Sequence, residues 1–293
     1  MAAARLRKRD VSGIALDHVG VVTRDLAALA AQYEHLGFTL TPLARQADGR
    51  IGNRCAMLHG SYVELLAVVD PNAGSATLDR FLARYAGIHI LAFAIDDQPV
   101  LARLQRAGIE VPSVAHIDRP IDDMDPAGPR ARFALIQLPD QPEGRINLVR
   151  HLAPEVLWQE RFLRHANNAS ALDEVLLAVA EPAETASRFS HLIGCVVIPD
   201  PAGGFALDLA RGRVRLLPPD ADVSAVPCIT GLSVRTSDRN AAIGRLLVER
   251  GIPHQARDNA LIVHAAAAGG VAVRFVPAAG NRVNVQPSAP SIV

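Results

Sequence analysis

Apolar and polar positions follow one order that recurs along the chain. Residues 14–22 form an apolar run of strand length, and residues 26–36 carry apolar side chains at helical spacing up to Gly37. A short run of β-branched residues favours a strand, whereas a period near 3.6 favours an amphipathic helix. Further apolar runs predict three more strands before residue 68. The segment 87–150 then repeats this order of one strand, one helix and three strands.

The second half of the chain repeats the first. LDHV at 16–19 corresponds to LDEV at 172–175, and YVELLAV at 62–68 corresponds to RVRLLPP at 213–219. The offset between matching segments shrinks along the chain because the loops shorten, while the order of the elements is kept. Self-similarity of this kind indicates an internal duplication.

These repeats predict an α+β fold of four βαβββ units arranged as two paired modules. We expect an N-terminal module at 10–152, a helical connector at 153–169 and a C-terminal module at 170–278. The final segment, 279–293, has no hydrophobic periodicity, so we expect a disordered tail. Each module is predicted to be an open, curled, mixed sheet, a cup with its helices outside.

Composition narrows the range of partners. The chain has 293 residues, 49% of them hydrophobic, with 30 basic and 30 acidic side chains, so its formal net charge is zero. A neutral chain is not expected to bind nucleic acid, and no apolar run is long enough to span a membrane. The three cysteines are scattered, which suits a reducing compartment. We therefore expect a cytoplasmic monomer or homodimer with a small-molecule ligand.

The paired units resemble the vicinal oxygen chelate superfamily, and within it the glyoxalase-like domain branch. The residues that carry the resemblance are LDHVGVVTRDLAALAAQYEHLGF at 16–38, GNRCAMLHGSYVELLAV at 52–68, GIHILAFAIDD at 87–97 and PEGRINLV at 142–149. The resemblance covers residues 14–150 well and residues 171–277 more loosely. It implies that two units pair into a cup with a metal ion inside, held from the first and fourth strand of each unit.

Carried over to this chain, the positions that hold the metal fall on His18, Glu64, His89 and Asn147. The last one departs from the pattern, because the resemblance leads us to expect a glutamate where this chain has an amide. We therefore expect three metal ligands, His18, Glu64 and His89, with open positions for a substrate. Such a set suits one divalent ion of Fe, Mn, Ni, Co or Zn.

The residues themselves support this set, since each of the three is a strongly polar side chain on a mainly apolar strand. A buried charge without a partner costs several kcal/mol, roughly, and a metal ion removes that cost. Isolated histidines on apolar strands also occur as hydrogen-bonded core residues, so a cup without metal is the competing interpretation. We expect substrate contacts from five further residues: Asn147, Arg45, Asn53, His116 and Arg132.

The second half differs at the matching positions, which are Glu174, Arg215 and Ser233. A guanidinium has no lone pair to offer a metal, so we expect Glu174 and Arg215 to form an ion pair. The C-terminal module is therefore predicted to be structural or to serve as a binding lobe.

The resemblance implies a metal-dependent lyase or isomerase of glyoxalase type, acting on a small molecule with two vicinal oxygens. Glu64 is the candidate catalytic base if it leaves the metal. Two alternatives stay open. One is an extradiol-type dioxygenase with non-haem Fe(II), and the other is a non-catalytic protein that binds a small molecule in the cup.

Overall fold

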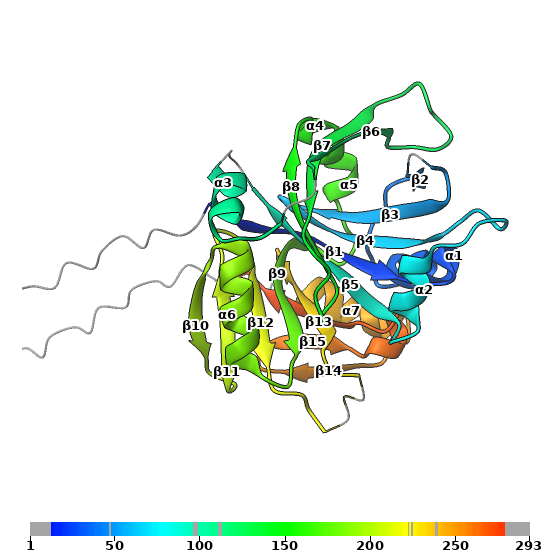
Figure 1. Cartoon of the computed structure of the whole chain (residues 1–293). Coiled ribbons are helices and arrows are strands. Elements are labelled where there is room, and N and C mark those ends of the chain that lie inside the picture. Colours follow the sequence, from blue (N-terminus) through cyan, green and yellow to red (C-terminus); the bar gives the residue numbers. More distant parts are fainter. Residues whose placement is uncertain are drawn as a thin grey trace, which may run out of the picture.

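The computed structural model describes residues 13–278 apart from residues 47, 96–98, 111–112, 222, 224 and 238–239. The predicted disordered tail, 279–293, lies outside these described residues. The fold is α+β, as predicted, and its elements follow the chain as successive βαβββ units (Figure 1). None of the helices within the described ranges is long and apolar enough to cross a membrane.

The N-terminal module contains two units. The first comprises β1 (Ala15–Val22), α1 (Leu26–His35), β2 (Ala44–Arg45), β3 (Ile51–Leu58) and β4 (Ser61–Val68). After α2 (Ala76–Leu82), the second comprises β5 (Gly87–Ala94), α3 (Pro99–Arg106), β6 (Ala115–Pro120), β7 (Arg130–Gln137) and β8 (Arg145–His151). The connector that follows holds the short helices α4 (Pro154–Leu157) and α5 (Glu160–Leu163).

The C-terminal module repeats this order. Its first unit comprises β9 (Ala169–Ala178), α6 (Pro182–Ile193), β10 (Val196–Asp200), β11 (Gly204–Asp208) and β12 (Arg213–Leu217). Its second unit comprises β13 (Cys228–Thr236), α7 (Ala241–Glu249), β14 (His254–Arg257), β15 (Ala260–Val263) and β16 (Ala272–Pro277).

The pairing of strands is the same in both modules. In every unit the first strand pairs in parallel with the fourth, as β1 does with β4, β5 with β8, β9 with β12 and β13 with β16. The first strands of the two units then pair antiparallel, β1 with β5 and β9 with β13. A single residue pair, Ile88 with Ile229, joins β5 to β13 and so makes the two modules one open sheet.

The sheet of the N-terminal module bends, because its two edge strands come close to each other. Its strands run in the order β2-β3-β4-β1-β5-β8-β7-β6. In a flat sheet the outer strands would lie roughly 30 Å apart, since neighbouring strands are about 4.8 Å apart. The backbone N–H of Asp123, just after β6, nevertheless donates to the carbonyl of Leu43 at 2.7 Å, just before β2. The two edges therefore meet, and the sheet forms a cup.

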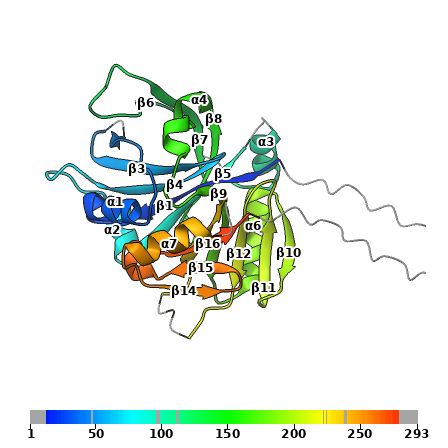
Figure 2. The ribbon, with the colours of Figure 1, turned by 180° about the vertical axis from the view of Figure 1, so that it is seen from behind.

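The helices and the convex faces of both modules share one apolar core. Leu29 and Tyr33 of α1 belong to it together with Phe189 of α6 and Leu247 of α7. Helices α1 and α7 lie on the same side of the molecule (Figure 2). The guanidinium of Arg250, just after α7, donates to the carbonyls of Glu34 and His35 at the end of α1. The concave face of the N-terminal module points away from this core, and a second apolar cluster covers part of it. In that cluster Leu78 and Phe81 of α2 pack on Val22, Leu66 and Ile90.

Candidate metal and substrate site

Three polar side chains share the concave face of the N-terminal module. His18 on β1 pairs with Ala92 on β5, which in turn pairs with Asn147 on β8. Glu64 on β4 pairs with Gly20, two residues beyond His18. Side chains alternate along a strand and paired residues lie on the same face. The structure therefore brings His18, Glu64 and Asn147 to one face, the three positions that the sequence analysis assigns to the metal or the substrate.

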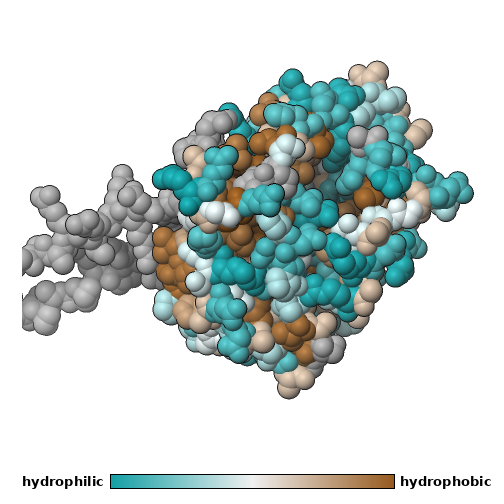
Figure 3. Space-filling model, viewed as in Figure 1, coloured by the Kyte–Doolittle hydropathy of each residue, from teal (hydrophilic) through white to brown (hydrophobic). Residues whose placement is uncertain are grey.

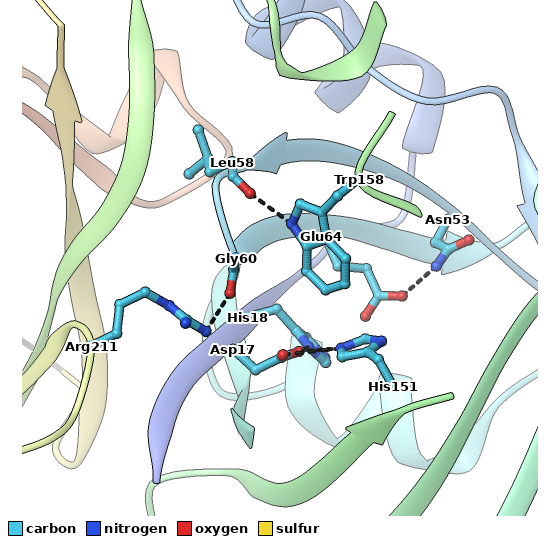
Figure 4. Close-up of polar contacts among 9 residues, drawn as sticks. All are labelled: Asp17, His18, Asn53, Leu58, Gly60, Glu64, His151, Trp158 and Arg211. Atoms are coloured by element: carbon cyan, nitrogen blue, oxygen red, sulfur yellow. Dashed lines mark hydrogen bonds and ion pairs between the residues drawn. The ribbon is translucent and has the colours of Figure 1, made fainter. Parts of the chain in front are cut away.

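A β-bulge fixes the imidazole of His18. The register passes from Leu16 opposite Phe93 to His18 opposite Ala92, which leaves Asp17 as an extra residue. The Asp17 carboxylate, 1% exposed, accepts from Nδ1 of His18 at 2.6 Å and from Nε2 of His151 at 3.0 Å (Figure 4). An ionised carboxylate only accepts, so Nε2 of His18 and Nδ1 of His151 are the ring nitrogens left with lone pairs.

The ionised state of Asp17 is strongly favoured. Burial alone would raise the pKa of this carboxyl, but the hydrogen bonds from His151 and His18 outweigh it and lower the pKa to about 2. A carboxylate behind an imidazole is the arrangement that orients metal-bound histidines in proteins. His18 is thus prepared to offer Nε2 to a cation.

The other two side chains are oxygen donors. The Glu64 carboxylate accepts a short hydrogen bond from the side-chain amide of Asn53 on β3 (Figure 4). The amide oxygen of Asn147 is buried and has no hydrogen-bond partner among the described residues. A buried oxygen without a partner costs about 1–3 kcal/mol, so Asn147 is expected to accept from, or coordinate, a group that binds here.

Aromatic rings enclose this face. Tyr62 of β4 stacks on His18 with ring centroids 4.3 Å apart, and Trp158, just after α4, stands edge-on to His151 at 4.8 Å. The indole N–H of Trp158 donates to the carbonyl of Leu58 at 2.8 Å, which fixes the connector against β3 (Figure 4). We call the hollow of about 470 Å³ beside these rings the connector cleft; it is lined by Asp17, Gly60, Ala94, Ile95, Val149, Arg150, His151, Pro154, Glu155, Trp158 and Arg211.

A larger hollow of about 650 Å³ lies between α3 and α6. Its cation, Arg103, already donates to the carbonyls of His191 and Leu192. We therefore do not place the site there.

His89 does not take the position that the sequence analysis assigns to it. It is the extra residue of a second bulge, between Gly20 opposite Ile90 and Val21 opposite Ile88. Rotating β1 onto β5 by the symmetry of this pairing superimposes His18 on Ile90 and Glu64 on Asn147. The position equivalent to His18 is thus apolar.

The surroundings of His89 suit a core residue. Its Nε2 donates to the carbonyl of Tyr85 at 2.9 Å, and its ring lies between those of Phe81 and Tyr85, at 4.9 and 4.0 Å. Burial lowers the pKa of His89 to about 4, so the ring is neutral. Among the described residues, no three His, Cys, Asp or Glu side chains lie together in a way that could hold a metal ion.

Of the other residues predicted to contact a substrate, Asn53 lies at the site, whereas Arg45, His116 and Arg132 do not. Asn53 reaches the site through Glu64. Arg45 pairs at 2.9 Å with Asp123 where the two edges of the cup meet. His116 and Arg132 are exposed, and their register on β6 and β7 places them on the face opposite to that of Asn147.

The sequence analysis missed His151 and Asp17. Both carried a signal: His151 lies four residues beyond Asn147 on the same strand, hence on the same face, and Asp17 directly precedes His18.

In the C-terminal module the predicted ion pair between Glu174 and Arg215 is confirmed, at 3.7 Å. The stronger partner of Arg215 is Asp200, whose two carboxylate oxygens each accept from the guanidinium at 2.7 Å. These hydrogen bonds lower the pKa of Asp200 and raise that of Arg215. Glu174, Asp200 and Arg215 thus form one cluster of ion pairs on this concave face.

Comparison with known proteins agrees with this architecture. The model of a family described as "Glyoxalase-like domain" matches residues 16–193, more than half of the chain. No curated protein matches the sequence.

Solved structures show the same fold at low identity. A triple mutant of 4-hydroxymandelate synthase from Streptomyces coelicolor is 15% identical at a TM-score of 0.62, and covers 92% of this chain and 93% of its own. The 2,2',3-trihydroxybiphenyl 1,2-dioxygenase of Sphingomonas wittichii is 15% identical at 0.54, with 91% of each chain covered. The Mn(II)-bound glyoxalase of Novosphingobium aromaticivorans is 16% identical at 0.54, covering 91% of this chain and 82% of that one.

Proposed function

Because the chain belongs to the glyoxalase-like domain family, within the vicinal oxygen chelate superfamily, we propose that its N-terminal cup is a metal-dependent active site. The proposed activity is that of a lyase or isomerase of glyoxalase type, acting on a small molecule with two vicinal oxygens. The observation that carries the proposal is the buried, unpartnered amide oxygen of Asn147 on the same face as His18 and Glu64.

The donor set fits a divalent ion. His18 offers Nε2, Glu64 a carboxylate and Asn147 an amide oxygen, so one nitrogen and two oxygens replace the three ligands expected from the sequence. Mixed nitrogen and oxygen ligands suit Mn, Fe, Co, Ni and Zn. A bound ion of this kind supplies Lewis-acid polarisation of two neighbouring oxygens.

The other residues of the cup position and enclose these donors. Asp17 holds the tautomer of His18, and Tyr62 keeps its ring from rotating. Trp158 closes the side of the cup next to His151, which limits access of water to the face. If it leaves the metal, Glu64 is the candidate proton acceptor, because its only other partner among the described residues is the neutral amide of Asn53.

Metal binding to the purified protein tests the proposal. We expect wild-type protein prepared without chelator to take up roughly one equivalent of Mn(II), Fe(II), Co(II), Ni(II) or Zn(II) in calorimetric titration. His18→Ala is expected to weaken binding at least about tenfold, since loss of a supporting or direct ligand costs that much or more. His89→Gln is the matched control and should leave the affinity unchanged.

Circular dichroism confirms that both variants fold. Wild-type protein that binds none of the five ions would overturn the metal-dependent function and favour the non-catalytic binder. Oxygen uptake by the Fe(II) form with a catechol would instead assign the extradiol reaction.

A further inference from the structure

Arg119 is a cation on the concave face of the N-terminal module that the proposed function does not use. It lies on β6 and pairs with Ala131 of β7, while Gln137 of β7 pairs with Asn147 of β8. Side chains alternate along a strand, and Ala131 and Gln137 are an even number of positions apart, so both lie on one face. The register therefore places Arg119 on the face of the proposed metal donors.

The closed cup brings β6 close to the wall formed by β3 and β4. A backbone hydrogen bond joins the chain just after β6 to the chain just before β2, which is the neighbour of β3. On that wall Cys55 pairs with Glu64, so their side chains share the concave face. Tyr62 of β4 stacks on His18 at 4.3 Å. The side chains nearest to the proposed metal donors are thus those that β6 approaches.

Electrostatic interactions show how far the guanidinium of Arg119 reaches. Burial raises the pKa of the Cys55 thiol and the pKa of the Tyr62 hydroxyl, and the charge of Glu64 raises both further. The charge of Arg119 acts in the opposite sense and lowers both pKa values. An interaction between charges weakens with distance and with screening by water. A guanidinium that acts on both groups therefore lies inside the cup.

This guanidinium has no anionic partner. Within the described residues Arg119 forms no ion pair and no side-chain hydrogen bond, whereas Arg130 of the same hairpin pairs with Asp118 at 2.5 Å. The Arg119 side chain is also half-buried, so water solvates it only in part. A planar guanidinium in this state is suited to a carboxylate, which accepts two of its N–H groups at once.

The acidic groups of this face do not cancel its positive charge once a metal ion is bound. Asp17 is held by two histidines, and Glu64 is a proposed ligand of the ion. Arg145, two positions before Asn147 on β8, is a second arginine of this face without an ion pair among the described residues. Two carboxylates thus face two guanidinium groups and a divalent cation, a balance that favours a negatively charged substrate.

We propose that Arg119 binds a carboxylate of the substrate, and that the site selects acids whose two vicinal oxygens lie elsewhere in the molecule. The vicinal oxygens lie at the donors of the ion, and the carboxylate lies against Arg119. This inference rests on the function proposed above and adds the class of substrate. The side of the molecule in Figure 3 is mainly hydrophilic, with apolar side chains in small separate patches, which suits a small polar ligand better than an apolar partner protein.

Two probes that differ by one charge test the assignment. Protocatechuate carries two vicinal hydroxyl groups and a separate carboxylate, and its primary amide is the uncharged analogue. We would titrate each probe, without oxygen, into the full-length protein by calorimetry, once with Mn(II) and once with EDTA. We expect the wild type to bind the acid at least about tenfold more tightly than the amide. This preference should hold in both conditions, because Arg119 is unpaired in either.

Substitutions assign the preference to one side chain. Arg119→Gln should remove it, and Arg119→Lys should keep part of it, because an ammonium retains the charge but not the paired donors. Arg132→Gln is the matched control, since it removes an arginine from the opposite face of the same hairpin, and it should keep the full preference. The affinity for the amide should be the same in all four proteins, which shows that each variant folds.

Equal binding of acid and amide by the wild type overturns the proposal, as does the wild-type preference in Arg119→Gln or failure of both probes to bind. The effect of Mn(II) is measured separately. A protein that prefers the acid but gains no affinity from Mn(II) would contradict the metal-dependent function and leave the role of Arg119 intact.

Discussion

The two concave faces use one backbone frame for opposite purposes. His18 and Glu174 each follow a bulged aspartate, Asp17 or Asp173, on the first strand of their module. Glu64 and Arg215 each pair with the residue two positions further along that strand. The chemistry at these matched positions is nevertheless different.

The difference lies in what satisfies the polar groups. In the C-terminal module Arg215 is bound by Asp200 and Glu174. On the same face, Oγ of Ser233 and Nε of Arg274 are buried and have no partner among the described residues. In the N-terminal module Glu64 has only a neutral amide, and Asn147 has a buried oxygen with no partner among the described residues. The groups left without a partner therefore differ in chemistry. The N-terminal face leaves an oxygen with lone pairs for a cation, whereas the C-terminal face leaves a guanidinium nitrogen, which has none to offer.

The largest expected effect is on the pH dependence of stability, and it comes from His89, the bulged residue of β5. Its pKa in the folded protein is about 4, below the ordinary value of 6.5. The unfolded chain therefore binds more protons between these values, and stability rises with pH there. Above about pH 6.5 the neutral ring of His89 does not lower the free energy of unfolding. As the pH falls from 6.5 to 4, this group lowers the free energy of unfolding by about 3 kcal/mol.

Urea unfolding of wild type and His89→Gln across this range measures the effect. The wild type should lose stability between pH 6.5 and 4, and the variant should lose about 3 kcal/mol less over the same interval. Equal slopes for the two proteins would show that this bulge does not make the N-terminal module sensitive to acid.

The next largest effect is the loss of stability when the ion pair of Arg215 and Asp200 in the C-terminal module is removed. Arg215→Met removes both hydrogen bonds to Asp200, a carboxylate whose side chain is 1% exposed. We expect a loss of about 2 kcal/mol in the free energy of unfolding, below the value of about 3–5 kcal/mol for fully buried pairs because Arg215 is itself partly exposed. Glu64→Gln at the matched position should cost less than about 1 kcal/mol, since it removes no ion pair.

Denaturant titrations at neutral pH compare the two variants directly. If Glu64→Gln destabilised the protein as much as Arg215→Met, the Glu64 carboxylate would be as fully satisfied in the folded protein as Arg215 is, and the argument for an open donor set would fail.

Sequence reasoning reached the parts of the fold that depend on alternation and repetition. The apolar runs on either side of Gly37 and the match of 16–19 with 172–175 predict the order of units that the structure shows. Alternation within each strand separates His18 from Val19, and Glu64 from Val63 and Leu65, so each polar side chain lies on the face opposite to these core residues. These features are local, and each is written in a few consecutive residues.

The site residues that the sequence analysis placed wrongly lie where one extra residue changes the pairing register of a strand. The bulge at His89 shifts β5 by one position, so Ile90 rather than His89 matches His18. A slip of one residue reverses the faces of a strand, and no composition signal marks it. His151 meets Asp17 across 134 positions of sequence separation, a contact that only the closed cup creates. His116 and Arg132 were misplaced for the same reason, because the register of the β6–β7 hairpin decides which face they occupy.

The smallest expected effect sharpens the comparison at Asn147, the symmetry mate of Glu64. Asn147→Glu would place a second carboxylate at the position where the unpartnered amide oxygen now lies. An anionic oxygen binds a divalent cation more strongly than an amide does, so we expect Mn(II) affinity to rise about tenfold, or about 1.4 kcal/mol. Gln137→Glu is the control. Gln137 lies on β7 and pairs with Asn147 on β8, so this substitution adds the same charge one strand away. Calorimetric titration of both variants with Mn(II) separates a ligand from a general electrostatic effect. Equal gains in the two variants would mean that Asn147 does not face the ion, and would leave His18 and Glu64 without their third donor.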